Sequence, residues 1–233
     1  MRYFSTLICM LCAYYPLSTT AEGTVIPHPV VFELFTSQGC SSCPPADKIA
    51  SKYADYAGIL VLSYHVNYWD YLGWKDPYST SENTDRQREY ASAYLHSRVV
   101  YTPQAVIQGV FDVVGSDELA LQGALSKASK NTIWVEAKLK ITDGKLNVTL
   151  PVTSNVNANL LIVGYQKYAS NAVPRGENSG TILTHRNSVT NIIPLGQWHG
   201  DALNMTKDRP SGDGVAVLIQ SSDKGEIIGA GWL

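Results

Sequence analysis

Apolar residues in the first part of the chain form short continuous runs, separated by a stretch with helical spacing. Val30–Phe35 and Ile59–Val66 are almost uninterrupted apolar runs, which is typical of strands covered on both faces of a sheet. Between them, Pro44 and Pro45 predict the start of a helix, and Gly58 is placed to end it. Strand, helix and strand in this order predict a βαβ unit with a right-handed crossover.

Two more helices and a hairpin are expected in the next part of the chain. Ser79 followed by Glu82 is a candidate capping box at the start of one helix. Residues 102–107 and 110–114 flank a Gln-Gly turn and predict a hairpin. Asp117 is placed to cap the last helix. The apolar residues Leu119, Ala124, Leu125 and Ala128 lie on that helix.

The hydrophobic period changes from helical to alternating after Asn131. Apolar and polar residues alternate up to Ile141, and Asp143-Gly144 is a strong hairpin signal. Further strands are expected at 159–167, 181–189, 215–220 and 227–232. We therefore predict two domains. Residues 22–130 should form a mainly parallel sheet with helices on both faces, and residues 131–233 an antiparallel, sandwich-like β domain packed against it.

The first 21 residues have the features of a secretory signal peptide. Arg2 precedes an uncharged, mostly apolar run, Tyr3–Leu17, and the small residues Thr19–Ala21 form a cleavage site. The run is shorter than the roughly 20 residues that a spanning helix needs. We expect a periplasmic or secreted protein without stable membrane insertion after cleavage; an uncleaved anchor is the alternative. The formal net charge of −2 gives no electrostatic reason to expect nucleic-acid binding.

Two cysteines carry the candidate chemistry. Cleavage would remove Cys9 and Cys12 and leave Cys40 and Cys43 as a C-x-x-C pair between the first strand and the first helix. The positive end of a helix stabilises a thiolate, so Cys40 is the candidate nucleophile and Cys43 the resolving thiol. Gly39 and the neighbouring serines should leave the approach to Cys40 uncrowded. The alternatives are half of a metal site and an inert clip.

This arrangement resembles the thioredoxin superfamily. The order βαβ–α–ββα places the C-x-x-C after the first strand and Thr102-Pro103 before the hairpin, and the resemblance implies that Pro103 is cis and faces the dithiol. The segment Glu33–Asp47 is also similar to the signature of an exported bacterial thioredoxin-like family, domain of unknown function 1223. Three further blocks resemble that family, at residues 65–77, 101–104 and 175–187.

The chain departs from ordinary thioredoxin next to the dithiol. Ser41-Ser42 replaces Gly-Pro between the cysteines, and Gly39 replaces the usual Trp. These positions help to set the reduction potential and the fit of partners, so neither property transfers to this chain.

Other residues have a functional and a structural interpretation. Glu33 is charged within a central strand, so it would either take the proton of Cys43 or be a paired structural carboxylate. The aromatic segment 64–78 would either wall a substrate groove beside Cys40 or pack as a small core of its own. The candidate substrate-binding residues of this segment are Trp69, Asp70 and Trp74.

The stretch 175–180 has the composition of a hairpin turn, and its functional interpretation is a lid over the dithiol. The candidate residues of this lid are Arg175, Glu177 and Asn178.

The leading function hypothesis is a periplasmic thiol–disulfide oxidoreductase that needs no cofactor, with Pro103 and nearby Thr102 holding the substrate strand. Its expected partners are protein thiols or disulfides, with a membrane redox protein as an additional candidate. The competing hypothesis is a non-catalytic binding module for a peptide, protein or small ligand. A weaker hypothesis is copper handling by Cys40, Cys43 and His65.

Overall fold

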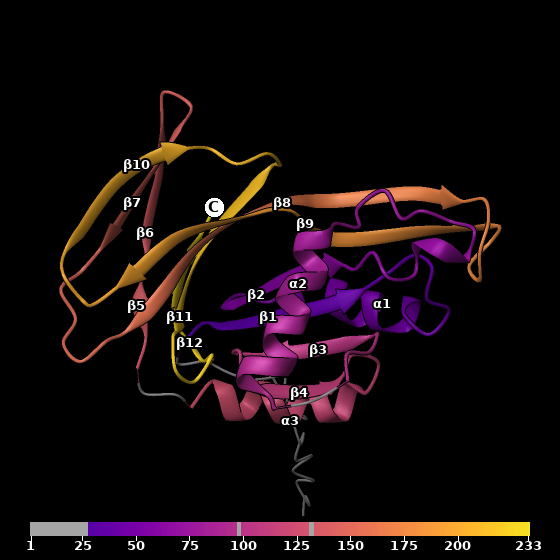
Figure 1. Cartoon of the computed structure of the whole chain (residues 1–233), viewed down its shortest axis with the longest axis horizontal. Helices are drawn as coiled ribbons and strands as arrows, with labels where there is room; N and C mark the ends of the chain where they lie inside the picture. The colour runs from indigo at the N-terminus through magenta and orange to yellow at the C-terminus, as the bar shows by residue number, and fades with distance from the viewer. Residues whose placement is uncertain (1–27, 97–98, 131–132) are drawn as a thin grey trace, which may run out of the picture.

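The computed structural model describes residues 28–96, 99–130 and 133–233 (Figure 1). Within these ranges the chain is a mixed α/β structure, with one nine-stranded sheet and a second sheet of three antiparallel strands. No helix of the described residues is long and apolar enough to cross a membrane. The expected signal peptide, residues 1–21, lies outside the described residues.

The predicted βαβ unit is present at the start of the described chain. Strand β1 (Val30–Thr36) leads through helix α1 (Pro44–Tyr53) to strand β2 (Ile59–His65), which runs parallel to β1. Every residue of both strands is buried, because α-helices cover both faces of this part of the sheet. Two prolines open α1, where a missing N–H costs little.

The predicted hairpin adds two antiparallel strands to β1. It consists of β3 (Gln104–Ile107) and β4 (Phe111–Val114) and is followed by α3 (Glu118–Ala128). Asp117 caps α3 as expected, but Leu119 is exposed. The order β4-β3-β1-β2 contains one parallel pair among the described strands. The expectation of a mainly parallel sheet was therefore wrong, because the hairpin turns β3 and β4 against β1.

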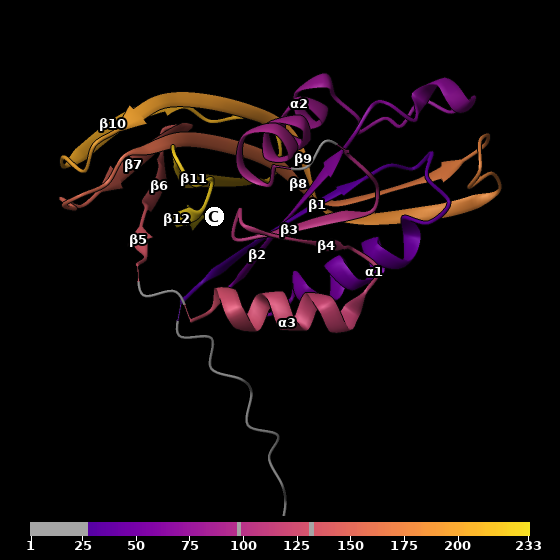
Figure 2. The same ribbon diagram turned by 60° about the horizontal axis from the view of Figure 1, so that its bottom comes forward.

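Helix α2 (Ser81–Glu89) continues into a π-helical turn, η2 (Tyr90–Tyr94). Its N-cap is Thr80, whose side chain accepts the N–H of Asn83, and not Ser79 as predicted. The two faces of the sheet are covered by different helices (Figure 2). One core cluster lies under α1 and α3, and the other includes Tyr90 of η2.

The hairpin predicted at Asp143-Gly144 forms the centre of the small sheet. Its strands are β6 (Lys138–Thr142) and β7 (Lys145–Leu150), and β10 (Leu203–Asp208) pairs with β7. The sequence analysis missed β10, whose residues are half-buried or exposed. With few buried apolar positions, the strand has little alternating pattern to reveal it.

The remaining strands extend the large sheet to the other end of the molecule. They are β8 (Ala158–Val173), β9 (Thr181–Trp198), β11 (Gly214–Ser221), β12 (Ile227–Trp232) and β5 (Val135–Glu136). The order continues as β2-β9-β8-β11-β12-β5. A single residue pair, Ser63 with Ser188, connects β2 to β9. The two halves of the chain thus share one sheet.

The third core cluster lies between the small sheet and the distal strands of the large one. It packs apolar residues of β6 and β7 against those of β8, β11 and β12, which is the sandwich-like packing expected for the second half. In the opposite direction, the β8–β9 ribbon extends past the end of β2 toward the beginning of α1 (Figure 1). This extension brings residues near 178 to the cysteine pair.

Candidate functional site

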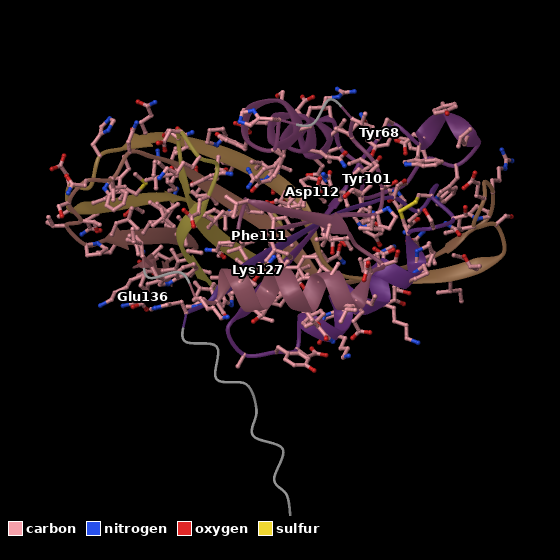
Figure 3. All side chains as sticks on the ribbon, turned by 90° about the horizontal axis from the view of Figure 1, so that it is seen from below. Tyr68, Tyr101, Phe111, Asp112, Lys127 and Glu136 are labelled. Atoms are coloured by element: carbon pink, nitrogen blue, oxygen red, sulfur yellow. A yellow bond between two sulfur atoms is a disulfide. The ribbon has the colours of Figure 1, made fainter. Side chains whose placement is uncertain are left out.

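Cys40 and Cys43 form a disulfide at the junction of β1 and α1 (the yellow bond in Figure 3). Their Cα atoms are 5.4 Å apart, and the N–H of Cys43 donates to the carbonyl of Cys40 at 3.2 Å. Cys43 has helical backbone angles, φ −79° and ψ −36°, and directly precedes α1. Both cysteines are completely buried. The expectation of an uncrowded approach to Cys40 was therefore wrong.

The turn between β8 and β9, residues 174–180 and here called the hairpin tip, is bonded to the loop that carries the cysteines. The side-chain amide of Asn178 donates to the carbonyl oxygens of Gln38 and Cys40 at 2.8 and 3.0 Å. The carboxylate of Glu177 accepts the N–H of Ser41 at 3.0 Å, and the hydrogen bonds from Ser41 lower the pKa of Glu177. Arg175 is exposed at the surface. The hairpin tip thus contacts residues 37–43 between β1 and α1, here called the dithiol loop. This is the position that the lid interpretation requires.

Thr102 and Pro103 lie on the neighbouring segment, and their peptide bond is cis, as the thioredoxin resemblance implies. Pro103 is buried. A Cβ atom on Gly115 would lie 3.2 Å from Cβ of Ala46 and 3.3 Å from Cβ of Pro103. Pro103 and the first turn of α1 therefore converge on Gly115. Tyr101, which precedes Thr102 and is labelled in Figure 3, donates its hydroxyl to the carboxylate of Asp112 at 2.6 Å.

The aromatic segment connects these parts through two indoles. Trp69 donates its Nε1–H to the hydroxyl of Thr102 at 2.8 Å, and a Cβ on Gly39 would lie 3.0 Å from Cβ of Trp69. Trp74 donates to Oε1 of Gln38 at 3.1 Å. Both indole N–H groups therefore bond to residues of the protein itself, and Trp69 packs against the main core cluster.

Asp70 serves its own loop. Its carboxylate accepts the N–H of Asp76 at 3.2 Å and the hydroxyl of Ser79 at 2.8 Å. These are the contacts of a turn acceptor.

A buried ion pair lies directly behind the dithiol loop. Nδ1 of His65 is 2.7 Å from the carboxylate of Asp76, and both side chains are completely buried. Burial lowers the pKa of His65, but the charge and hydrogen bond of Asp76 outweigh it, so the pKa is raised. Burial raises the pKa of Asp76, but His65 and the N–H groups of Gln38 and Tyr78 outweigh it, so that pKa is lowered. Both shifts favour the charged forms of the pair. The carboxylate of Asp76 also accepts the main-chain N–H of Gln38 at 2.8 Å.

The amide of Gln38 orients a second histidine. Trp74 is a donor, so Oε1 of Gln38 must face it, and Nε2 of Gln38 then donates to Nε2 of His185 at 3.1 Å. The ring proton of neutral His185 must therefore be on Nδ1. That atom is 3.6 Å from the carboxylate of Asp47, which is too long for a hydrogen bond.

Asp47 is a buried carboxylate that makes no hydrogen bond through either oxygen within the described residues. It lies one turn after Cys43, and its N–H bonds to the carbonyl of Cys43 at 3.1 Å. Residues four apart share a helix face, so the carboxylate lies on the side of Cys43. Gln38, Asp47 and His185 were not among the predicted site residues. All three lie within the blocks that resemble the family, residues 33–47 and 175–187, and the spacing from Cys43 to Asp47 was a second signal for one of them.

Glu33 occupies the opposite face of the sheet. Its neighbours Phe32 and Leu34 belong to the core under α1, whereas the Glu33 carboxylate binds Arg86 at 2.6 and 3.0 Å and also Tyr90. The hypothesis that Glu33 takes the proton of Cys43 was therefore wrong, because the sheet lies between the two side chains. The alternative of a paired structural carboxylate describes its contacts.

Within the described ranges, no group of three or more His, Cys, Asp or Glu side chains is placed to hold a metal ion. Of the residues considered for copper, the cysteines are joined to each other. The ring nitrogens of His65 face Asp76 at 2.7 Å and Ser188 at 3.4 Å. This arrangement does not present the three side chains as a ligand set.

The comparisons with known proteins place this chain in a family. Residues 31–220 match the family described as "Protein of unknown function (DUF1223)". This chain is similar to protein AGR_C_4864 from Agrobacterium tumefaciens, whose crystal structure is known. The sequences are 31% identical and the structures superpose with a TM-score of 0.75, over 88% of this chain and 93% of that one.

A second solved structure, HBP35 of Porphyromonas gingivalis, is 15% identical with a TM-score of 0.64, over 89% of this chain and 75% of that one. That likeness concerns the fold. No curated protein matches the sequence. The family match covers most of the chain, and with the Agrobacterium relative it shows that this protein belongs to the DUF1223 family.

Proposed function

We propose that this protein is a thiol–disulfide oxidoreductase of the thioredoxin-like type that works outside the cytoplasm. The observation that carries the proposal is the Cys40–Cys43 disulfide at the N-terminus of α1. Disulfides persist in oxidising compartments, and the signal-peptide pattern of residues 1–21 supports export to one. The order β4-β3-β1-β2, with α1 and α3 on one face and η2 on the other, supports the thioredoxin-like interpretation.

In the exchange reaction a client thiolate attacks Sγ of Cys40, and the disulfide breaks with its electron pair leaving on Cys43. A second client thiol then attacks the mixed disulfide, which yields an oxidised client and the Cys40–Cys43 dithiol. In the reverse direction the Cys43 thiolate attacks the mixed disulfide and releases the client thiolate. The N-terminus of α1 favours the thiolate form of Cys40.

Asp47 is the carboxylate placed to handle the proton of Cys43. It is buried on the same helix face, without a hydrogen bond to either oxygen among the described residues, so the thiol formed on reduction gains an acceptor there. When Cys43 attacks a mixed disulfide, Asp47 would hold its proton until the departing client thiolate or water takes it up. Nδ1 of His185, on β9, lies 3.6 Å from the carboxylate of Asp47.

One observation favours a non-catalytic binding module as the second candidate function. Both cysteines are completely buried beneath the hairpin tip. A disulfide that served only to shape the loop would need no access to solvent.

A turnover assay separates the two candidates. The wild type should catalyse either insulin-disulfide reduction or dithiol oxidation, and Cys40→Ser and Cys43→Ser should both lose catalysis. The reduced protein should also show a Cys40 thiol that titrates below about 8.5, the ordinary pKa of a cysteine. Absence of turnover in both directions, together with an ordinary Cys40 pKa, would favour the binding module.

A further inference from the structure

Few hydrogen bonds hold the hairpin tip to the dithiol loop. Asn178 and Glu177 make three side-chain hydrogen bonds to the dithiol loop, and all three go to main-chain atoms: the carbonyls of residues 38 and 40 and the N–H of residue 41. Cys40 is 0% exposed, so an external sulfur can reach it only when a neighbouring segment moves. The hairpin tip bonds the loop before, at and after Cys40, which makes it the candidate for that movement.

The hairpin tip is built to move as one piece. Its own hydrogen bonds close within it: Ser179 bonds to Pro174 at 3.0 Å through its hydroxyl and to Gly176 at 3.1 Å through its N–H. Gly180 donates to Val173 at 2.8 Å. These bonds do not depend on the dithiol loop. Lifting the hairpin tip thus costs the hydrogen bonds of Asn178 and Glu177 and the close approach of Gly176 to Trp74, without unfolding the turn.

The movement is confined to the hairpin tip, because the supporting ribbon is bonded to the rest of the protein: Asn171 and His185 bond Gln38, and Arg186 bonds Asp55. β9 is paired to β2 at Ser188, and the ribbon between that point and the hairpin tip is β8 paired with β9. At the start of this stretch, Asn187 has φ +51° and donates its side-chain amide to the carbonyl of Val61 at 2.8 Å. The ribbon therefore leaves the sheet at a fixed point and reaches the dithiol as a two-stranded arm (Figure 1).

Removal of the hairpin tip would leave a particular set of bonding groups around Cys40. Two carbonyl oxygens lose a donor and one N–H loses an acceptor, all within four consecutive residues. Once uncovered, these groups pair either with water or with another chain. An extended polypeptide carries N–H and C=O groups along its length and can pair with such a stretch, whereas a simple dithiol has neither group.

We propose that the hairpin tip occupies the client's position, and that the client is a polypeptide that displaces it by pairing with residues 38–41. Asn178 and Glu177 then set the access to Cys40 and select clients that replace their bonds. This inference rests on the proposed function, because it concerns the client of the same disulfide.

The first arm of the test measures access. Asn178→Ala removes two hydrogen bonds from the closed form and should raise the rate of disulfide reduction by dithiothreitol about tenfold, from the ordinary strength of such bonds. Ser179→Ala, whose hydroxyl bonds within the hairpin tip, is the matched control and should react at the wild-type rate. Equal rates for Asn178→Ala and the wild type would overturn the role of the hairpin tip as a cover.

The second arm identifies the client. In Cys43→Ser, Cys40 is joined either to a cysteine-containing peptide of about ten residues or to a methylthio group. Hydrogen exchange is then followed in residues 174–180 and at the amide of Ser41. The peptide adduct should speed exchange in the hairpin tip and keep Ser41 protected, because the peptide accepts its N–H. The methylthio adduct should leave Ser41 less protected than the peptide adduct does.

Each outcome decides between the proposals. If both adducts give the same exchange pattern, the polypeptide client is wrong, while the proposed redox function stands. If Asn178→Ala opens the site to dithiothreitol but no peptide forms an adduct, the client assignment fails in the same way. If neither arm gives any reaction at Cys40 in the folded protein, the redox function and this inference both fall.

Discussion

At the scale of single residues, the site depends on groups that fix one another through donor and acceptor roles. Trp74 orients the amide of Gln38, and that amide places the ring proton of His185 on the nitrogen that faces Asp47. The cysteine motif revealed Cys40 and Cys43 because their spacing is a property of the sequence. Asp47 and His185 are 138 positions apart in the printed numbering and meet only through the fold. No local pattern could have paired them.

Asp47→Asn tests the proton-handling role. A general base contributes on the order of a hundredfold or more, so release of glutathione from a Cys40 mixed disulfide should slow about a hundredfold at pH 7. The two rates should converge above the pKa of the Cys43 thiol, because the thiolate then forms without a base. Rapid-quench mass spectrometry at several pH values measures the release.

The exposed Asp55, which pairs with Arg186 at 2.8 Å, supplies the control Asp55→Asn. It should release glutathione at the wild-type rate. An equal slowing of Asp47→Asn at every pH would indicate a structural effect and contradict the role as a base.

The His65–Asp76 pair predicts how stability depends on pH. The pKa of Asp76 is lowered, so its contribution exists above its ordinary pKa and disappears as the pH falls through the lowered value. The pKa of His65 is raised, so its contribution is complete below its ordinary pKa and disappears as the pH rises through the raised value. Asp76→Asn should therefore lose most stability between about pH 4 and pH 6.5.

The loss should be about 3 kcal/mol, because one partner of a buried pair remains uncompensated. Urea unfolding of both proteins across pH 3 to 9 gives the difference. A difference that does not change with pH would mean that the pair is not charged in the folded protein.

At the scale of elements, alternating and helical patterns predicted the strands and helices of the first half well. The buried strands are continuous apolar runs, and Asp117 caps α3 as its residue type favours. The patterns were less informative for β8 and β9, whose outer parts carry exposed residues such as Tyr168 and Ile182. An arm that is solvated on one side has a weak pattern, so its reach over the dithiol could not be read from periodicity.

Packing at the end of β4 gives a prediction with an internal control. An alanine Cβ at position 115 would lie 2.8 Å from Cδ1 of Leu34 and 3.3 Å from Cβ of Pro103. Gly115→Ala should cost about 1–3 kcal/mol from overpacking. Gly123→Ala in α3 meets no atom within 4 Å and should gain about 0.5–1 kcal/mol of helix propensity. Thermal unfolding measures both, and a neutral Gly115→Ala would mean that Pro103 is free to move away.

At the scale of the whole molecule, one buried polar cluster connects the two halves. Arg86 of α2 binds Glu33 of β1 and also contacts Gln220 of β11 at 3.3 Å. Gln220 in turn donates to the hydroxyl of Tyr90 at 3.1 Å. The sequence analysis predicted two packed domains, but it could not predict that the halves share a sheet, since that depends on the pairing of Ser63 with Ser188.

Arg86→Met should destabilise the protein by about 3–5 kcal/mol, because it leaves the Glu33 carboxylate buried and unpaired. The double variant Glu33→Met with Arg86→Met should recover most of this loss, since no buried charge remains. Arg88→Met removes an exposed pair with Asp85 and should change stability by less than about 1 kcal/mol. Urea denaturation of the four proteins tests this, and a loss below 1 kcal/mol for Arg86→Met would contradict it.

The central claim is that the mixed disulfide with the client forms at Cys40 and that Cys43 resolves it. The most direct measurement is covalent trapping in an oxidising compartment, with each variant expressed with residues 1–21 retained. Cys43→Ser should accumulate high-mass adducts on non-reducing gels that collapse with dithiothreitol, because the group that releases the mixed disulfide is absent. Cys40→Ser should trap far fewer clients, because the assigned roles make Cys43 the resolving thiol and not the site of the mixed disulfide. Equal trapping by both variants, or adducts on Cys40→Ser alone, would contradict the assigned roles.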